Sequence, residues 1–206
     1  MAVSFENSQT FAVGRGPVAV TSADLNGDGH ADLVSASFRD NAISVLLGNG
    51  DGTFQVQKTL AVGPFPRKVT GVDLNGDGRI DLVSTNSGDG TVSILVGNGD
   101  GTFQAQQTLA VGSDPRAVTS ADLNGDGHTD LLGGNYGDYG DSSVSVLIGN
   151  GNGTFEQASG DRISLGGQTY TLSRAQNGDA VLLLSGGGSV ELTGIKAEQV
   201  NTGFFG

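Results

Sequence analysis

Residues 73–82 read D-L-N-G-D-G-R-I-D-L, a run in which oxygen-bearing side chains alternate with glycine and apolar residues. Its first six letters occur three times in the 206-residue chain, beginning at Asp24, Asp73 and Asp122, so each copy lies 49 residues after the previous one. Self-similarity at a fixed period of about 20–50 residues is the mark of a repeat architecture. The chain is therefore expected to be built from copies of one structural unit.

Phenylalanines mark the limits of the repeat. Phe5, Phe54 and Phe103 keep the same spacing, and Phe155 follows 52 residues after Phe103 because the segment 135–143 is three residues longer than its counterparts. The repeat thus covers residues 5–155.

Each period predicts four short strands. In the second repeat the strand-forming runs are 54–62, 68–72, 80–84 and 91–96, closed by a glycine-rich turn at 97–101. Four short strands in about 40–50 residues describe a propeller blade, and no segment has a helical period. We expect an all-β fold, a partial β-propeller of about three four-stranded blades with a small C-terminal β-hairpin module.

The chain begins inside the repeat. Residues 5–17 align with 54–66, so they correspond to the last strand of a blade whose earlier strands are absent. Closed propellers have about 4–8 blades, more than the three found here. Two arrangements follow: a homodimer that completes a six-bladed ring, or missing blades that belong to a longer chain.

Each aspartate loop has the form D-x-N-x-D-G-x-x-D. Positions 1, 3 and 5 direct side-chain oxygens toward one point, glycine at position 6 lets the chain turn sharply, position 7 offers its carbonyl and position 9 closes the shell. Hard oxygen ligands in this arrangement suit calcium, which predicts about three Ca²⁺ ions, one per repeat. The side-chain ligands expected in the loops 24–32, 73–81 and 122–130 are Asp24, Asn26, Asp28, Asp32, Asp73, Asn75, Asp77, Asp81, Asp122, Asn124, Asp126 and Asp130, and the backbone-carbonyl ligands are His30, Arg79 and His128.

Simple β-turns, magnesium sites and EF-hands fit these loops less well than calcium sites do. Asn-Gly and Asp-Gly often mark β-turns, but a turn needs only two such residues. Magnesium is less suited to a flexible cage built entirely from protein ligands. The loops are not EF-hands either, because Ser35, Ser84 and Gly133 stand where an EF-hand has its glutamate.

The unit D-L-N-G-D-G-x-x-D-L, followed by the run S-V-L-L-G-N-G-D-G-T-F at 44–54, resembles the FG-GAP or VCBS repeat of integrin-α-like β-propellers. The resemblance covers residues 5–155. It implies that each blade carries a structural calcium between its first two strands. Propellers of that family usually have seven blades, whereas this chain has three repeats.

The remaining motifs indicate structure rather than chemistry. His30 and His128 both occupy position 7 of a loop, where the second repeat has Arg79, so we expect solvent-facing side chains. The G-N-G-D-G turns are followed by strands rather than by the helix that a phosphate site requires. Phe54, Phe103 and Phe155 are expected between blades. No nucleophile, base and orienting group can be assembled, so an enzyme is not expected and no catalytic or cofactor-binding residue is assigned.

The longer segment at 135–143 carries Tyr136 and Tyr139. Loop residues on a rigid scaffold often take part in recognition, although an ordinary surface insertion is the simpler interpretation.

The repeat stops after Phe155. Residues 156–162 are interpreted as a linker, and 163–206 as a C-terminal β module whose strand-like runs are 162–165, 168–173, 179–184 and 189–194, with a hairpin turn at 185–188. The layout is similar to the C-terminal portions of RTX-type secreted bacterial proteins, which implies type I secretion. A plain β-hairpin that caps the last blade is the alternative.

Charge excludes several partners. The formal net charge is −12 with only ten basic residues, so neither nucleic acid nor an anionic membrane is an expected partner. No apolar run is long enough to insert into a membrane, and residues 1–14 do not resemble a Sec signal peptide. We expect a secreted, calcium-stabilised binding or adhesion module for a glycan or protein. A structural or accessory segment of a larger secreted enzyme or toxin is the alternative.

Overall fold

The structure is a computed structural model that describes residues 9–137, 142–164, 170–174, 179–184 and 189–196. Within these ranges the regular elements are all β-strands, and no helix has the length and apolar character needed to cross a membrane. The strands form three four-stranded antiparallel sheets, one per repeat, and a three-stranded sheet near the C-terminus.

The strands of the three blades follow the repeat. The first blade contains β1 (Pro17–Ala23), β2 (Asp32–Ser37), β3 (Ala42–Leu46) and β4 (Lys58–Ala61). The second contains β5 (Pro66–Val72), β6 (Asp81–Asn86), β7 (Thr91–Leu95) and β8 (Gln107–Ala110). The third contains β9 (Pro115–Ala121), β10 (Asp130–Asn135), β11 (Ser143–Gly149) and β12 (Phe155–Ser164). In every blade the strands pair in chain order.

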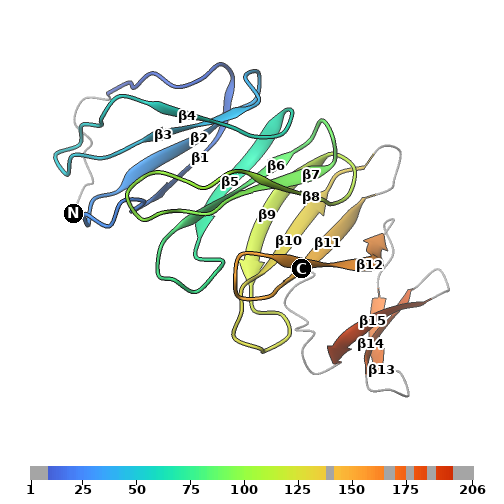
Figure 1. Cartoon of the computed structure of the whole chain (residues 1–206). Coiled ribbons are helices and arrows are strands. Elements are labelled where there is room, and N and C mark those ends of the chain that lie inside the picture. The colour runs from blue at the N-terminus through green and yellow to red at the C-terminus, as the bar shows by residue number, and fades with distance from the viewer. Residues whose placement is uncertain (1–8, 138–141, 165–169, 175–178, 185–188, 197–206) are drawn as a thin grey trace, which may run out of the picture.

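The blades lie side by side in chain order (Figure 1). The first strands β1, β5 and β9 contact one another from blade to blade, as the inner strands of a propeller do. The described blades do not close into a ring. The predicted all-β fold with three propeller-type blades is therefore confirmed.

The C-terminal sheet contains β13 (Tyr170–Arg174), β14 (Asp179–Leu184) and β15 (Ser189–Lys196). Its strands pair in chain order, and β15 contacts β12 of the third blade. The predicted strands at 179–184 and 189–194 agree with β14 and β15, while the predicted hairpin turn at 185–188 lies outside the described residues.

Two strand predictions need correction. The run 54–62 is not one strand: Phe54 makes an isolated bridge with Gly48, and β4 begins only at Lys58. Residues 156–162, interpreted as a linker, lie within β12, where Glu156, Gln157 and Arg162 pair with β11. Without β12 the edge of β11 would present unpaired backbone groups, which explains why strand pairing continues past the end of the sequence repeat.

The core lies between blades rather than inside one sheet. One cluster joins Val34, Ile43 and Val45 of the first blade to Leu82 and Leu95 of the second. A second cluster repeats the arrangement one blade further on, joining Val83, Val92 and Ile94 to Leu131 and Leu147. The second blade therefore buries one face against the first blade and the other face against the third.

The phenylalanines after the glycine-rich turns belong to these contacts. Phe103 packs against the first cluster and Phe155 against the second, as predicted for positions between blades. Phe54 has no preceding blade in this chain and instead meets Phe11 edge to face, with ring centroids 4.9 Å apart. The difference arises because the first blade is the end of the row.

We predict that equivalent leucines contribute unequally to stability. Leu82 is fully buried between two blades, whereas Leu33, its counterpart in the first blade, is only half-buried. Leu82→Ala should lower the free energy of unfolding by about 2–5 kcal/mol, since it leaves a cavity in a closed interface. Leu33→Ala is the matched control and should cost clearly less in urea denaturation. Equal losses would contradict the unequal packing.

Candidate metal loops and the opposite end of the blades

The three aspartate loops lie at the same end of the blades, between the first and second strands of each sheet. Asp24, at position 1, accepts hydrogen bonds from the amides of Gly27 and Gly29, both at 2.8 Å. Asp73 and Asp122 bind the equivalent glycine amides at 2.7–3.0 Å. The first aspartate thus shapes each loop by holding its backbone.

Position 5 is also bound within the loop. Asp28 accepts the amide of His30 and the side-chain amide of Asn26, both at 2.8 Å. These two donors hold the pKa of the Asp28 carboxyl below its usual value, the backbone amide contributing most, and Asp126 is affected in the same way by His128 and Asn124. Both groups are therefore charged at neutral pH.

The aspartate at position 9 is buried in every repeat. Asp32 accepts the amide of Leu25 at 2.8 Å and the amide of Gly48 at 2.7 Å, so one carboxylate joins the start of the loop to the turn after β3. Asp81 makes the same two bonds with Leu74 and Gly97, and Asp130 with Leu123 and Gly149.

No cation balances these buried carboxylates among the described residues, whose ion pairs involve other aspartates. Burial raises the pKa of Asp81, and the negative charges of Asp77 and Asp73 raise it further. Burial raises the pKa of Asp130 in the same way. Each loop therefore concentrates negative charge around a carboxylate that the protein only partly compensates.

The side chains at position 7 are exposed but not isolated. His30 and His128 lie directly against Gly50 and Gly151 of the turn after the third strand, and Arg79 lies against Gly99. A larger residue at these glycines would collide with the imidazole or guanidinium group. These side chains thus cover the turn, a contact that the repeat pattern does not predict.

Another contact missed from the sequence involves Gly48, Gly97 and Gly149. A Cβ atom at Gly97 would overlap the carbonyl oxygen of Ile80, which precedes the buried Asp81. The same collision would occur at the other two glycines, with Ala31 and Thr129. Glycine is required here because the turn must approach closely enough to donate its amide to the aspartate.

The donor set of each loop fits calcium chemically, since it offers three carboxylates, one amide oxygen and a carbonyl within nine residues. In the described conformation, however, no three acidic or histidine side chains of the described residues come together closely enough to hold a metal ion. The carboxylates at positions 1, 5 and 9 instead face backbone amides of the loop and the adjacent turn. A carboxylate oxygen has more than one acceptor site, so these amide bonds leave it capacity for a cation.

The opposite end of the blades carries aromatic and arginine side chains. Phe38 stacks on Phe65 with centroids 5.0 Å apart, and the guanidinium of Arg67 lies 4.8 Å from the Phe38 centroid. In the third blade Arg116 lies 3.8 Å from the centroid of Tyr136. Tyr139, the other tyrosine of the longer segment, lies outside the described residues.

Phe65 is held in an unusual backbone conformation. Its φ is +54°, a value that costs energy for a bulky residue, and its ring remains 46% exposed. Its amide donates to Asn41, and its carbonyl accepts the amide and the hydroxyl of Ser87. Asn41 of the first blade and Ser87 of the second thus hold the backbone of Phe65 in place.

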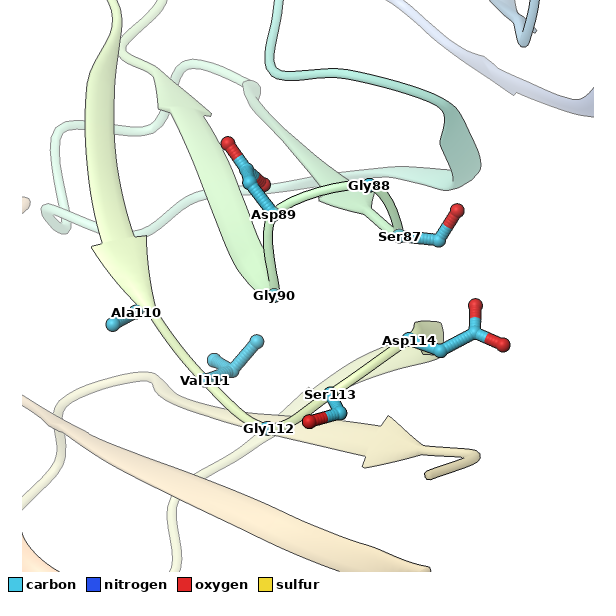
Figure 2. Close-up of a pocket in the computed structure, with 9 residues that line it drawn as sticks. All are labelled: Ser87, Gly88, Asp89, Gly90, Ala110, Val111, Gly112, Ser113 and Asp114. Carbon is cyan, nitrogen blue, oxygen red and sulfur yellow. The ribbon is translucent and has the colours of Figure 1, made fainter. Parts of the chain in front are cut away.

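An open hollow of about 500 Å³ lies at this end between the second and third blades. It is lined by Ser87, Gly88, Asp89, Gly90, Ala110, Val111, Gly112, Ser113 and Asp114. Figure 2 shows the carboxylates of Asp89 and Asp114 directed away from the space between the segments. Asp89 accepts the Thr91 hydroxyl, and Asp114 pairs with Arg116 at 2.6 Å. The two carboxylates therefore do not converge on one point inside the hollow.

Blades of this form, each with its aspartate loop between the first two strands, define a β-propeller-like repeat protein. The chain matches the FG-GAP-like repeat three times, over residues 24–84, 73–133 and 122–181, and it belongs to that family. The resemblance of the C-terminal segment to RTX-type proteins stays a prediction. No relative is found among curated proteins.

The solved structures similar to this chain share little sequence identity with it. A putative 6-phosphogluconolactonase from Bacteroides uniformis is 14% identical with a TM-score of 0.54, over 91% of this chain and 59% of that one. An Agrocybe aegerita lectin that recognises non-reducing terminal N-acetylglucosamine is 22% identical, with a TM-score of 0.46 over 88% and 52%. The Photorhabdus luminescens Tc holotoxin pore is 24% identical, with a TM-score of 0.41 over 80% and 8%. The chain thus spans from less than a tenth to about three fifths of these proteins.

We predict that the buried carboxylate supports the blade even without metal. Asp81→Leu leaves the amides of Leu74 and Gly97 without their acceptor. Each unsatisfied amide should lower the free energy of unfolding by about 1–3 kcal/mol. Asp100→Asn is the control, because Asp100 is exposed and the third repeat has Asn152 there. It should change the stability by no more than about 0.5 kcal/mol. Urea denaturation in calcium-free buffer measures both, and an unaffected Asp81→Leu variant would refute the role.

Proposed function

We propose that the chain is a calcium-stabilised, non-enzymatic binding module that acts outside the cell, with a glycan or protein as its partner. One observation carries the calcium assignment: three equivalent loops each place a buried aspartate, without a cation partner among the described ion pairs, beside further carboxylates. A divalent cation at each loop would balance this charge.

The ligands that would hold calcium in the second repeat are the side-chain oxygens of Asp73, Asn75, Asp77 and Asp81, with the carbonyl of Arg79. The first and third repeats offer the equivalent residues. Bound calcium would supply positive charge and a cross-link between the two ends of the loop. Because Asp81 also holds Leu74 and Gly97, that cross-link would extend to the turn after β7. Three calcium ions would halve the formal net charge of −12.

The proposed location follows from the same chemistry. Extracellular modules bind calcium with dissociation constants of about 10⁻⁴–10⁻³ M, so weak loops of this kind are filled only where calcium is abundant. The RTX-like layout of the C-terminal segment supports export by a type I system.

The end opposite the aspartate loops is the proposed partner-binding end. Phe65 and Tyr136 are 46% and 58% exposed. Arg116 lies over the ring of Tyr136, and Arg67 lies over the ring of Phe38, which stacks on Phe65. Aromatic residues and arginine are enriched where proteins meet their partners. The hydrogen bonds that hold Phe65 reduce the entropy that a partner would have to remove on binding.

The calcium proposal predicts a metal-dependent melting temperature. Chelator should lower it and added calcium should restore it, because a ligand at one hundred times its dissociation constant stabilises the fold by about 2.7 kcal/mol per site. Calorimetric titration should give about three calcium ions per chain. An identical melting curve in chelator and in calcium would refute the proposal.

A single-loop variant makes this test specific. Asp77→Ala should reduce the calcium stoichiometry from about three to about two, since it removes one ligand from one loop. Asp100→Ala, an aspartate of the same blade outside the loop, should leave the stoichiometry unchanged. An equal effect of the two variants would show that general acidity, not the loop, attracts the metal.

Partner binding is tested with a glycan array and with surface proteins of candidate host cells. The double variant Phe65→Ala/Tyr136→Ala should weaken any binding about tenfold or more, because it removes both exposed aromatic groups. Val56→Ala is the control, as Val56 is 91% exposed but lies near the aspartate-loop end. Absence of any ligand for the wild-type chain would favour the alternative, a structural segment of a larger secreted protein.

A further inference from the structure

The first blade exposes a face that the other blades bury. Val20 of β1 is 64% exposed, whereas its counterparts Val69 and Val118 are 0% and 6% exposed. Those two valines are covered because a preceding blade packs on them. The open face around Val20 is therefore a copy of a surface that this chain twice uses as an interface.

The third blade exposes the complementary face. Val144 and Val146 of β11 are half-buried, whereas the equivalent Ile43 and Val45 of the first blade are 0% and 1% exposed. In the first and second blades this face packs against the following blade. The exposed face of the third blade is thus of the type that packs, elsewhere in the chain, against the face that the first blade exposes.

Residues 9–16 occupy the place of an outer strand that belongs to a blade before the first. The amide of Gly14 donates to Ser44 at 3.1 Å, as the amide of Gly63 does to Ser93 in the next blade. The amide of Phe38 donates to the carbonyl of Gly16 at 3.0 Å, the counterpart of the bond from Ser87 to Phe65. Residues 14–16 therefore make the same hydrogen bonds as residues 63–65 of the next blade.

The outer strand of the third blade departs from the repeat. The motif T-L-A-V-G at 59–63 recurs at 108–112, and residues 10–14 read T-F-A-V-G. At the equivalent positions, 160–164, the third blade reads G-D-R-I-S instead, and its pairing with β11 has a register shift between Ser145 and Leu147. The segment that best fits the edge of the third blade is thus found at the N-terminal side of the first.

One chain cannot bring these parts together, because its first and third blades lie on opposite sides of the second (Figure 1). We propose that two copies of the chain close into a six-bladed ring. The open face of each first blade packs against the third blade of the other copy, and residues 9–14 of each copy pair with β11 of the other in place of residues 162–164. Six blades lie within the range of about 4–8 that closed propellers use. A two-fold exchange of this kind covers both open faces and leaves no blade edge unpaired.

Engineered cysteines test the exchange, because the chain has none of its own. Ser44 pairs with Thr59, and Ser93 with Thr108, so in the ring Thr10 would pair with Ser145 of the other copy. Directly opposed residues of antiparallel strands lie at about 4.5–5.5 Å, which suits a disulfide. The variant Thr10→Cys/Ser145→Cys should form, on oxidation, a product of twice the 20.7 kDa of one chain that reductant reverses.

The matched control is Thr10→Cys/Ser93→Cys. Ser93 is already paired with Thr108 in its own blade, so this variant should remain unlinked. Equal cross-linking of the two variants would indicate random collision and would overturn the proposal.

A second measurement needs no cysteine. Light scattering of the wild-type chain in calcium should give a dimer, and Val20→Lys should shift it to a monomer with its strand content unchanged, since Val20 is exposed in a single chain. A wild-type monomer at every concentration would overturn the proposal. This readout does not depend on partner binding, and repeating it in chelator separates failure of the ring from failure of the calcium sites.

Discussion

The buried aspartate at the ninth position of each loop is the interaction on which the blade depends. Asp32, Asp81 and Asp130 each accept one amide from the loop and one from the turn after the third strand. A carboxylate can bridge two amide donors in this way because it has two oxygens and no hydrogen of its own. The loop between the first two strands and the turn after the third are thereby held at one end of the blade.

That bridge dictates other features of the sequence. The turn must come close enough to donate its amide, which requires glycine at position 97 and its equivalents. The burial of Asp81 raises its pKa and leaves a charge that no described ion pair balances. The bridge therefore accounts for one glycine and one buried acidic residue in each blade.

The two ends of the blades differ in chemistry. At one end aspartates and amides dominate, while at the other Phe38 and Tyr136 lie beside arginines and Phe65 stacks on Phe38. The strands between them are covered by neighbouring blades, so variation in the loops at either end costs little packing energy. Such a scaffold can keep one end for stability and use the other for recognition.

Much of this architecture can be predicted from the local sequence pattern. The repeat predicts the number of blades, most strand positions and the position of every aspartate loop, because turns and strand alternation depend on neighbouring residues. The same pattern gives wrong predictions where pairing depends on distant residues. Residues 54–57 form an isolated bridge and an irregular segment rather than the first half of a strand, and residues 156–162 belong to β12, which pairs with the edge of β11.

Only the tertiary structure distinguishes residues that the sequence treats as equal. Val20, Val69 and Val118 stand at the same position of the repeat, yet one is exposed and two are buried. Similarly, nothing local to Phe38 and Phe65 predicts that their rings stack across a blade boundary. The sequence alone determined what each blade is, through short-range hydrogen bonds and alternation. Which face of a blade is covered depends on the neighbouring blade that packs against it, and packing between distant segments appears only in three dimensions.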